Sequence, residues 1–177
     1  MVYPKGMDDV DFREDHYPSW NILSTPCVEE HTKALGFPAC YHSCENLGYC
    51  SADKDFIEAN STSVCNWNTC YDDIFFIQNL VDEMIENFGP IDDSKFVIIG
   101  GSNGGMMTYQ LSGNLQPEPS HFIPIYGNSP KGFEVVTNGK ANLLSFYDVY
   151  DTTVPMQGGE STDEWMDGFG EFLVERL

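Results

Sequence analysis

The sequence predicts an α/β domain of three layers built on a mostly parallel sheet. Three observations support this class. A long amphipathic helix pattern precedes a short strand rich in β-branched residues, a glycine-rich turn leads from that strand into a second helix, and two further strands follow. The chain has 177 residues, 41% of them apolar and 14% aromatic, which is enough for one packed domain. We therefore expect residues 1–177 to form a single domain.

The first part of the chain offers few regular elements. Residues 2–3 are strand-like, residues 4–6 form a turn, and an acidic loop then leads to residues 19–21. The following stretch is irregular and rich in cysteine, glycine, proline, asparagine and serine. We expect it to be an insertion within the domain, over residues 24–71.

The periodic part of the chain begins with a helix. Over residues 72–88, apolar side chains recur at spacings of three and four, which predicts a helix with one buried stripe. Asp72 and Asp73 favour its N-terminus, and Gly89 with Pro90 ends it.

A strand and a regular series of elements follow this helix. Residues 95–99 form a short apolar run of the kind found in parallel strands that are covered on both faces. The elements expected next are a glycine-rich turn, a helix, two strands and a final helix, over residues 100–105, 106–115, 121–126, 143–147 and 162–177. Pro124 weakens the first of the two strands, because proline cannot donate to a ladder.

Six cysteines gather in the insertion: Cys27, Cys40, Cys44, Cys50, Cys65 and Cys70. An even number in one short stretch favours disulfide bonds in an oxidising compartment, with the connectivity left open. The alternative is a metal site that His31 and His42 could join, but zinc ligands usually come in C-x2-C pairs, which this chain lacks. Asn60 begins an Asn-Ser-Thr glycosylation sequon. We therefore expect an extracellular, disulfide-stapled insertion, glycosylated at Asn60 and holding no metal.

The charge of the chain excludes two classes of partner. Acidic residues outnumber basic ones by 28 to 8, which gives a net charge of -20. Such a chain repels both a phosphate backbone and an anionic membrane surface. Its longest strongly apolar runs, such as residues 96–99, are far shorter than the ~20 residues of a membrane-spanning helix. We expect neither nucleic acid nor membrane as a partner.

The glycine-rich turn contains the candidate catalytic serine. Gly100-x-Ser102-x-Gly104 matches the G-x-S-x-G pattern, in which a sharp turn between a strand and a helix exposes a nucleophilic serine. The backbone N–H of Asn103 would then donate to a developing oxyanion. The competing interpretation is a turn that only joins strand to helix, or one that surrounds a phosphate. The turn lacks the lysine of a P-loop, which argues against a phosphate.

A nucleophilic serine needs an acid and a base, in the order serine, acid, histidine for this type of fold. Asp148 and Asp151 both follow the strand at residues 143–147, and spacing alone does not choose between them. The base is not where it is expected, because all four histidines precede Asp151: His16, His31, His42 and His121.

Six motifs occur in order along residues 2–160. They are Tyr3-Pro4-x-Gly6, Ser19-Trp20-Asn21, Cys65-Asn66-Trp67-Asn68-Thr69-Cys70, Tyr71-Asp72-Asp73-Ile74-x-Phe76-Ile77, Ser102-Asn103-Gly104-Gly105-Met106-Met107 and Asp151-x-x-Val154-Pro155-x-x-Gly158-Gly159. The series resembles the esterase family of polyhydroxybutyrate depolymerases and feruloyl or acetylxylan esterases. The resemblance implies an α/β-hydrolase fold and a secreted enzyme that cuts ester bonds in polyesters or on polysaccharides.

The resemblance also assigns roles to residues. It implies that Ser102 is the nucleophile, that Asp151 rather than Asp148 is the acid, and that the Asn103 N–H is an oxyanion donor. It implies no cofactor. The family's His-Gly oxyanion loop ahead of Tyr3 and its catalytic histidine near the C-terminus are not in this chain. We therefore expect an α/β-hydrolase domain that is incomplete at both ends, a fragment of a larger esterase with little activity by itself.

Two other functions stay open. A prolyl oligopeptidase-like serine peptidase uses a similar glycine-rich turn, but this does not explain residues 19–21 or the cysteine-rich insertion. A secreted binding module without catalysis would need no base. Trp20 is a candidate substrate contact, as is Trp67, although core packing or loop anchoring is the favoured role of each.

Overall fold

The structure is a computed structural model of the whole chain. It describes residues 1–10, 16–22, 69, 71–88, 92, 95–129, 142–160 and 171–172. The six cysteines, Asn60 and Trp67 lie outside the described residues, and so do the predictions made for them.

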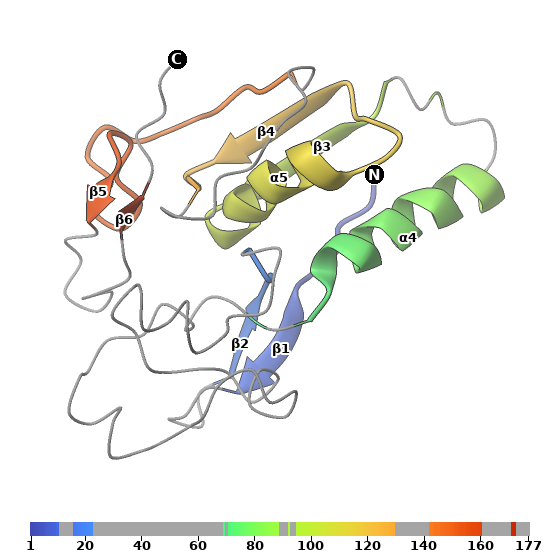
Figure 1. The fold of residues 1–177 in the computed structure, drawn as a ribbon, viewed down its shortest axis with the longest axis horizontal. Helices are drawn as coiled ribbons and strands as arrows, with labels where there is room; N and C mark the ends of the chain where they lie inside the picture. The colour runs from blue at the N-terminus through green and yellow to red at the C-terminus, as the bar shows by residue number, and fades with distance from the viewer. Residues whose placement is uncertain are drawn as a thin grey trace.

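A small parallel sheet forms the centre of the described structure. Strands β3 (Val97–Gly101) and β4 (His121–Ile125) pair in parallel, in a register that runs from Val97 opposite His121 to Gly101 opposite Ile125. A third extended segment, residues 142–147, runs parallel on the other side of β4 through bridges at Phe122–Leu143 and Ile125–Phe146. All three therefore end at the same edge of the sheet, toward which the β4 arrow points in Figure 1.

Pro124 lies within β4, although proline was expected to disfavour a central strand. The N–H groups of Phe122 and Tyr126 donate to Asn142 and Phe146, each at 2.8–2.9 Å. The nitrogen of Pro124 lies between them on the same edge of β4 and has no proton to donate, whereas its carbonyl accepts from the Phe146 N–H at 3.0 Å. The missing bond explains why the third segment pairs through separate bridges.

Helix α4 (Asp73–Asn87) confirms the helix predicted over residues 72–88. The Asp72 side chain caps it by accepting from the Phe75 N–H at 3.0 Å. The buried apolar side chains of this helix are Ile77 and Val81, which belong to the predicted stripe.

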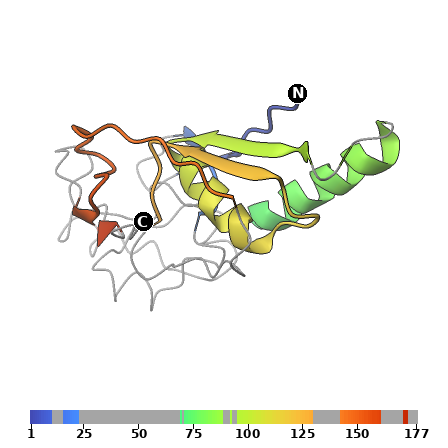
Figure 2. The same cartoon turned by 90° about the horizontal axis from the view of Figure 1, so that it is seen from above.

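Helix α5 (Asn103–Asn114) begins three residues earlier than the sequence pattern indicates, directly after Ser102. It packs against β3 and β4, and every residue from Gly105 to Leu111 is buried. Figure 2 shows α5 beneath the two strands, with α4 beside it on the same side of the sheet. The third segment is also attached to α5, because the Tyr109 hydroxyl hydrogen-bonds to the Ser145 hydroxyl at 2.9 Å and to that of Tyr147.

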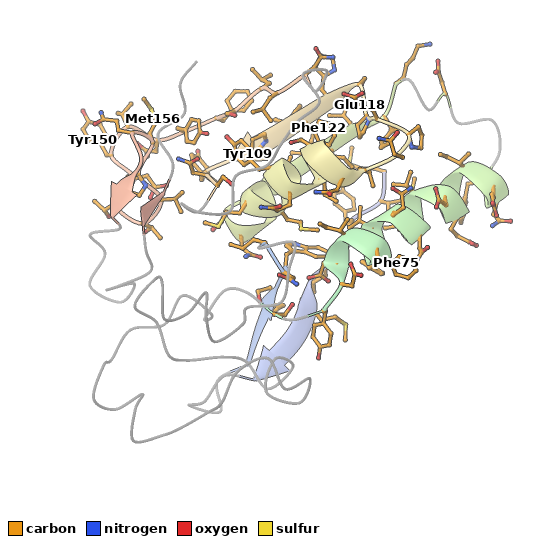
Figure 3. The ribbon with its side chains drawn as sticks, viewed as in Figure 1. Phe75, Tyr109, Glu118, Phe122, Tyr150 and Met156 are labelled. Carbon is orange, nitrogen blue, oxygen red and sulfur yellow. The ribbon has the colours of Figure 1, made fainter. Side chains whose placement is uncertain are left out.

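The hydrophobic core joins segments from across the described chain. Its buried members are Ile22, Ile77, Val81, Met106, Met107, Leu111, Leu115, Phe122 and Val154. Phe122 of β4 is completely buried in this core, and Figure 3 labels it in the region where β4 and α5 meet. Full burial of a side chain of this size contributes about 1.5–3 kcal/mol.

The face of the sheet opposite α5 is exposed. Val97 and Ile99 of β3 are 41% and 62% exposed, and Leu144 and Phe146 of the third segment are 50% exposed each. The prediction of a strand covered on both faces is therefore wrong for Val97 and Ile99. Only the α5 face, which carries Ile98 and Phe122, is covered.

The two ends of the described chain also differ from expectation. Strands β1 (Met7–Val10) and β2 (His16–Ser19) form an antiparallel pair where an acidic loop was predicted, and residues 2–3 have no regular structure. Strands β5 (Gly159–Glu160) and β6 (Glu171–Phe172) pair antiparallel, so the final helix is wrong at residues 171–172. Pairing between strands supplies hydrogen bonds that a local helix pattern does not reveal.

Two adjacent glycines at the end of β3 differ in the space around them. A Cβ atom on Gly100 would lie 2.0 Å from the Gly104 carbonyl oxygen, whereas one on Gly101 would meet no atom within 4 Å. We expect Gly100→Ala to lower the free energy of unfolding by about 2 kcal/mol or more, and Gly101→Ala to change it by less than about 0.5 kcal/mol. Urea unfolding of both variants measures this, and equal losses would contradict the packing described.

Candidate active site

The backbone at Ser102 is strained. Its φ of 52° and ψ of -121° place a residue with a Cβ in a region that such residues rarely adopt. The strand and the helix hold it there from both sides. The Ser102 N–H donates to the Ile125 carbonyl at the end of β4 at 2.8 Å, and its carbonyl accepts from the Met106 N–H in α5 at 3.0 Å. The strained turn is thus built into the junction of strand and helix.

Close contact between backbones supports this turn. A Cβ on Gly105 would lie 3.0 Å from the Ile125 carbonyl oxygen and 3.1 Å from the Gly127 Cα. The first turn of α5 therefore contacts the chain that leaves β4. Together with Gly100, these glycines allow the turn to close.

Residues 20–21 join three predicted motifs by hydrogen bonds. The Trp20 N–H donates to Asn103 Oδ1 at 2.7 Å, and the Asn21 N–H donates to Asp73 Oδ2 at 2.6 Å. The Asn21 side-chain amide also donates to the Tyr71 carbonyl at 2.9 Å. The residue after the proposed nucleophile is therefore connected to the first residue of α4.

Asp73 is a buried carboxylate. Burial raises its pKa above the ordinary value of 3.8, and the negative charge of Asp72 adds to this rise. The hydrogen bond from the Asn21 N–H and the nearby Thr69 side chain act in the opposite direction. Since burial dominates, Asp73 holds a proton more tightly in the folded chain than in the unfolded one.

The acid candidates lie in the loop after the third segment. Asp151 is half-buried, and its Oδ1 accepts from the Thr153 and Val154 N–H groups at 2.9 Å each. Asp148 is exposed, and its Oδ1 accepts from the Tyr150 N–H at 2.9 Å. Two backbone donors therefore orient the Asp151 carboxylate, whereas one orients that of Asp148.

This loop lies at the sheet edge that carries Ser102. The Ser102 N–H bonds to Ile125, and the next residue, Tyr126, bonds through its N–H to Phe146. The chain enters the loop of Asp148 and Asp151 two residues after Phe146. Figure 3 shows Tyr150 beyond the arrow end of β4. The structure therefore brings the loop to the same edge as the serine, as expected for carboxyl ends of parallel strands.

Of the four histidines, His121 is the one whose side chain the structure describes, and it lies too far from Ser102 to act as its base. His121 begins β4, whereas Ser102 is bonded to the end of that strand. The four residue steps between His121 and Ile125 cover roughly 13 Å. His31 and His42 lie outside the described residues, and the side chain of His16 is not described.

A cavity of about 670 Å³ lies beside the turn, between α4, α5 and β3, and the N-terminal segment lines it too. Ser102, Asn103 and Trp20 contribute to its wall. Trp20 is half-buried, packs against the core and stacks on Phe76 with 6.4 Å between ring centroids. Its side chain therefore packs against the core, as predicted, and also lines the cavity beside the serine; substrate contact stays a prediction.

Some residues of this site were not identified from the sequence. Asn21 stood within a recognised motif without an assigned role, Asp73 was expected only to favour the N-terminus of its helix, and Gly127 was not singled out. The available signals were a polar residue at the start of a predicted helix and a glycine directly after a predicted strand. Within the described residues, no group of three or more histidine, cysteine or acidic side chains gathers as a metal site. Among the described helices, none has the length and apolar character needed to cross a bilayer.

Comparison with models of protein families, with curated proteins and with solved structures finds no match for this chain. The functional interpretation therefore depends on the motifs and on the geometry of the turn.

Strain at Ser102 predicts an unusual effect of glycine. Ser102→Gly and Ser102→Ala both remove the hydroxyl, but only glycine removes the Cβ that conflicts with a positive φ. We expect Ser102→Gly to be more stable than Ser102→Ala by about 1 kcal/mol, the lower part of the range for such strain. Thermal or urea unfolding compares the two variants. Equal stability, or a less stable glycine variant, would show that the turn is not strained.

The raised pKa of Asp73 predicts a pH dependence. The stability that its protonation contributes is fully present below pH 3.8 and is lost as the pH rises through the raised pKa of the folded chain. The unaltered chain should therefore lose stability relative to Asp73→Asn as the pH rises. Urea unfolding across acidic pH measures the difference, with Glu86→Gln, an exposed position on α4, as the control. A difference that does not change with pH would refute the assignment.

Proposed function

We propose that this chain carries the nucleophile of a secreted serine carboxylic ester hydrolase that acts on polyesters or on acyl groups linked to polysaccharides. The observation that carries the proposal is the backbone of Ser102. It has a φ of 52° and a ψ of -121°, directly between a parallel strand and a helix. A strained serine in this position is the arrangement that G-x-S-x-G enzymes use to expose the hydroxyl.

The proposed reaction is acyl transfer in two steps. The Ser102 hydroxyl attacks the ester carbonyl and gives its proton to a base, while the oxyanion accepts from the Asn103 N–H. This N–H belongs to the first turn of α5, where the helix dipole favours negative charge. The alcohol leaves with the proton from the base, and water then releases the acid by the reverse sequence.

Asp151 is the proposed acid and would orient the base. Its two backbone donors, Thr153 and Val154, hold the carboxylate in one orientation. We propose that the base is a histidine supplied by a longer product of the gene, as in the esterase family that the motifs resemble. No cofactor takes part in this chemistry.

A binding module without catalysis is the second candidate function. The observation in its favour is that none of the four histidines in the sequence follows Asp151. The flanking genomic sequence separates the two candidates, because a Gly-His segment in frame after this chain would supply the base.

The function is tested by labelling the longest product of the gene with a fluorophosphonate probe. We expect labelling that is lost in Ser102→Ala, and hydrolysis of aryl esters in preference to aminoacyl-prolyl substrates. Asp151→Asn should lower kcat roughly 10⁴-fold, as loss of the orienting acid does in serine triads, whereas Asp148→Asn should have little effect. The 177-residue chain alone serves as a control and should show little turnover. An unlabelled intact protein would eliminate the hydrolase.

A further inference from the structure

Two consecutive residues connect the N-termini of both described helices. Asp73 is the first residue of α4 and Asn103 is the first residue of α5. The Asn21 N–H donates to the Asp73 carboxylate, and the N–H of Trp20, one residue earlier, donates to the Asn103 side chain. The pairs are separated by 52 and 83 residues in the sequence, so they form only in the folded chain.

We propose that Asp73 is a positioning residue for the oxyanion donor, acting through Asn21, Trp20 and Asn103. This inference rests on the proposed function. The Asp73 carboxylate holds residues 20–21 in place, and the Trp20 N–H then holds the Asn103 side chain. Because the proposed oxyanion donor is the N–H of Asn103 itself, fixing this residue from its side chain fixes the direction of the donor.

The end of this connection at Asp73 and Asn21 is buried. Asp73 is 3% exposed and Asn21 is 5% exposed. A hydrogen bond from an N–H to a carboxylate is shorter and stronger than one between neutral groups, and the 2.6 Å distance between Asn21 N and Asp73 Oδ2 fits this class. Loss of the carboxylate would leave the Asn21 N–H without this acceptor in a buried position.

The position of Asp73 is costly for the fold, which indicates a role beyond packing. Its carboxylate is buried, the neighbouring Asp72 is negative, and among the described residues no lysine or arginine pairs with it. Burial of a charge without a cation is unfavourable. The Asp72 side chain already caps α4 by accepting from Phe75, so Asp73 is not needed as the cap.

The contact between Trp20 and the serine turn extends beyond one hydrogen bond. A Cβ on Gly104 would lie 3.7 Å from the indole nitrogen of Trp20, which is ordinary van der Waals contact. The Trp20 ring therefore lies close enough to the residue after Asn103 that one added side-chain carbon would reach it. Movement of residues 20–21 would thus change both the Asn103 side chain and the packing beside the turn.

The test compares Asp73→Ala, Asp73→Asn and the control Glu86→Ala in the longest product of the gene, by kcat and KM on an aryl ester. We expect Asp73→Ala to lower kcat roughly 10- to 100-fold with little change in KM, because a displaced oxyanion donor acts on the transition state. Asp73→Asn should restore most of kcat, since its amide oxygen still accepts from the Asn21 N–H. The control should match the unaltered enzyme.

Three results would overturn the proposal: an unchanged kcat in Asp73→Ala, a change confined to KM, or a loss in Asp73→Asn as large as in Asp73→Ala. Asn103→Ala breaks the other end of the connection and should give a similar loss of kcat, which keeps the test valid where Asp73→Ala does not fold.

A second measurement separates this proposal from the proposed function. Amide hydrogen exchange of the 177-residue chain, followed by NMR, reports the connection without any catalysis. We expect protection of the Trp20 and Asn21 N–H groups, lost at both residues in Asp73→Ala and at Trp20 alone in Asn103→Ala. Fast exchange of both groups in the unaltered chain would refute the connection itself. Protected groups in a protein that the fluorophosphonate does not label would instead refute the hydrolase.

Discussion

The strained backbone of Ser102 is the constraint on which the rest of the described structure depends. Its positive φ persists because the N–H is bonded to the end of β4 and the carbonyl to the first turn of α5. The strand must end, and the helix must begin, within one residue of the serine. The glycines around it, in particular Gly100 and Gly105, follow from this requirement, because the strand, the turn and the chain after β4 approach within contact distance.

The same turn is connected to parts of the chain that are distant in sequence. Trp20 and Asn21 join it to the start of α4, and the parallel pairing of β4 with residues 142–147 brings the Asp151 loop to its edge of the sheet. A strained turn stays in place only when its surroundings are held as well. In this chain a parallel sheet and two hydrogen bonds hold them, one part-buried and one buried, and the buried bond requires the burial of a carboxylate.

Local patterns predicted the two helices and β4 within a few residues, because apolar periodicity and capping residues act over single turns. They failed where distant partners decide the structure. The pair of β1 and β2 replaced an acidic loop, β6 replaced part of a helix, and Pro124 is tolerated in β4 because its carbonyl still accepts from Phe146. Val97 and Ile99 were expected to be covered and are exposed.

The sequence by itself determined the serine in its G-x-S-x-G turn, the strand before it, the helix after it and the two acid candidates. Only the tertiary structure showed the backbone strain at Ser102, the two backbone N–H groups that orient the Asp151 carboxylate, and the hydrogen bond between the Asn21 N–H and the buried Asp73. The physical reason is the same in each case. A backbone angle held from two sides, and a carboxylate oriented by specific N–H groups, depend on partners that spacing along the chain does not reveal.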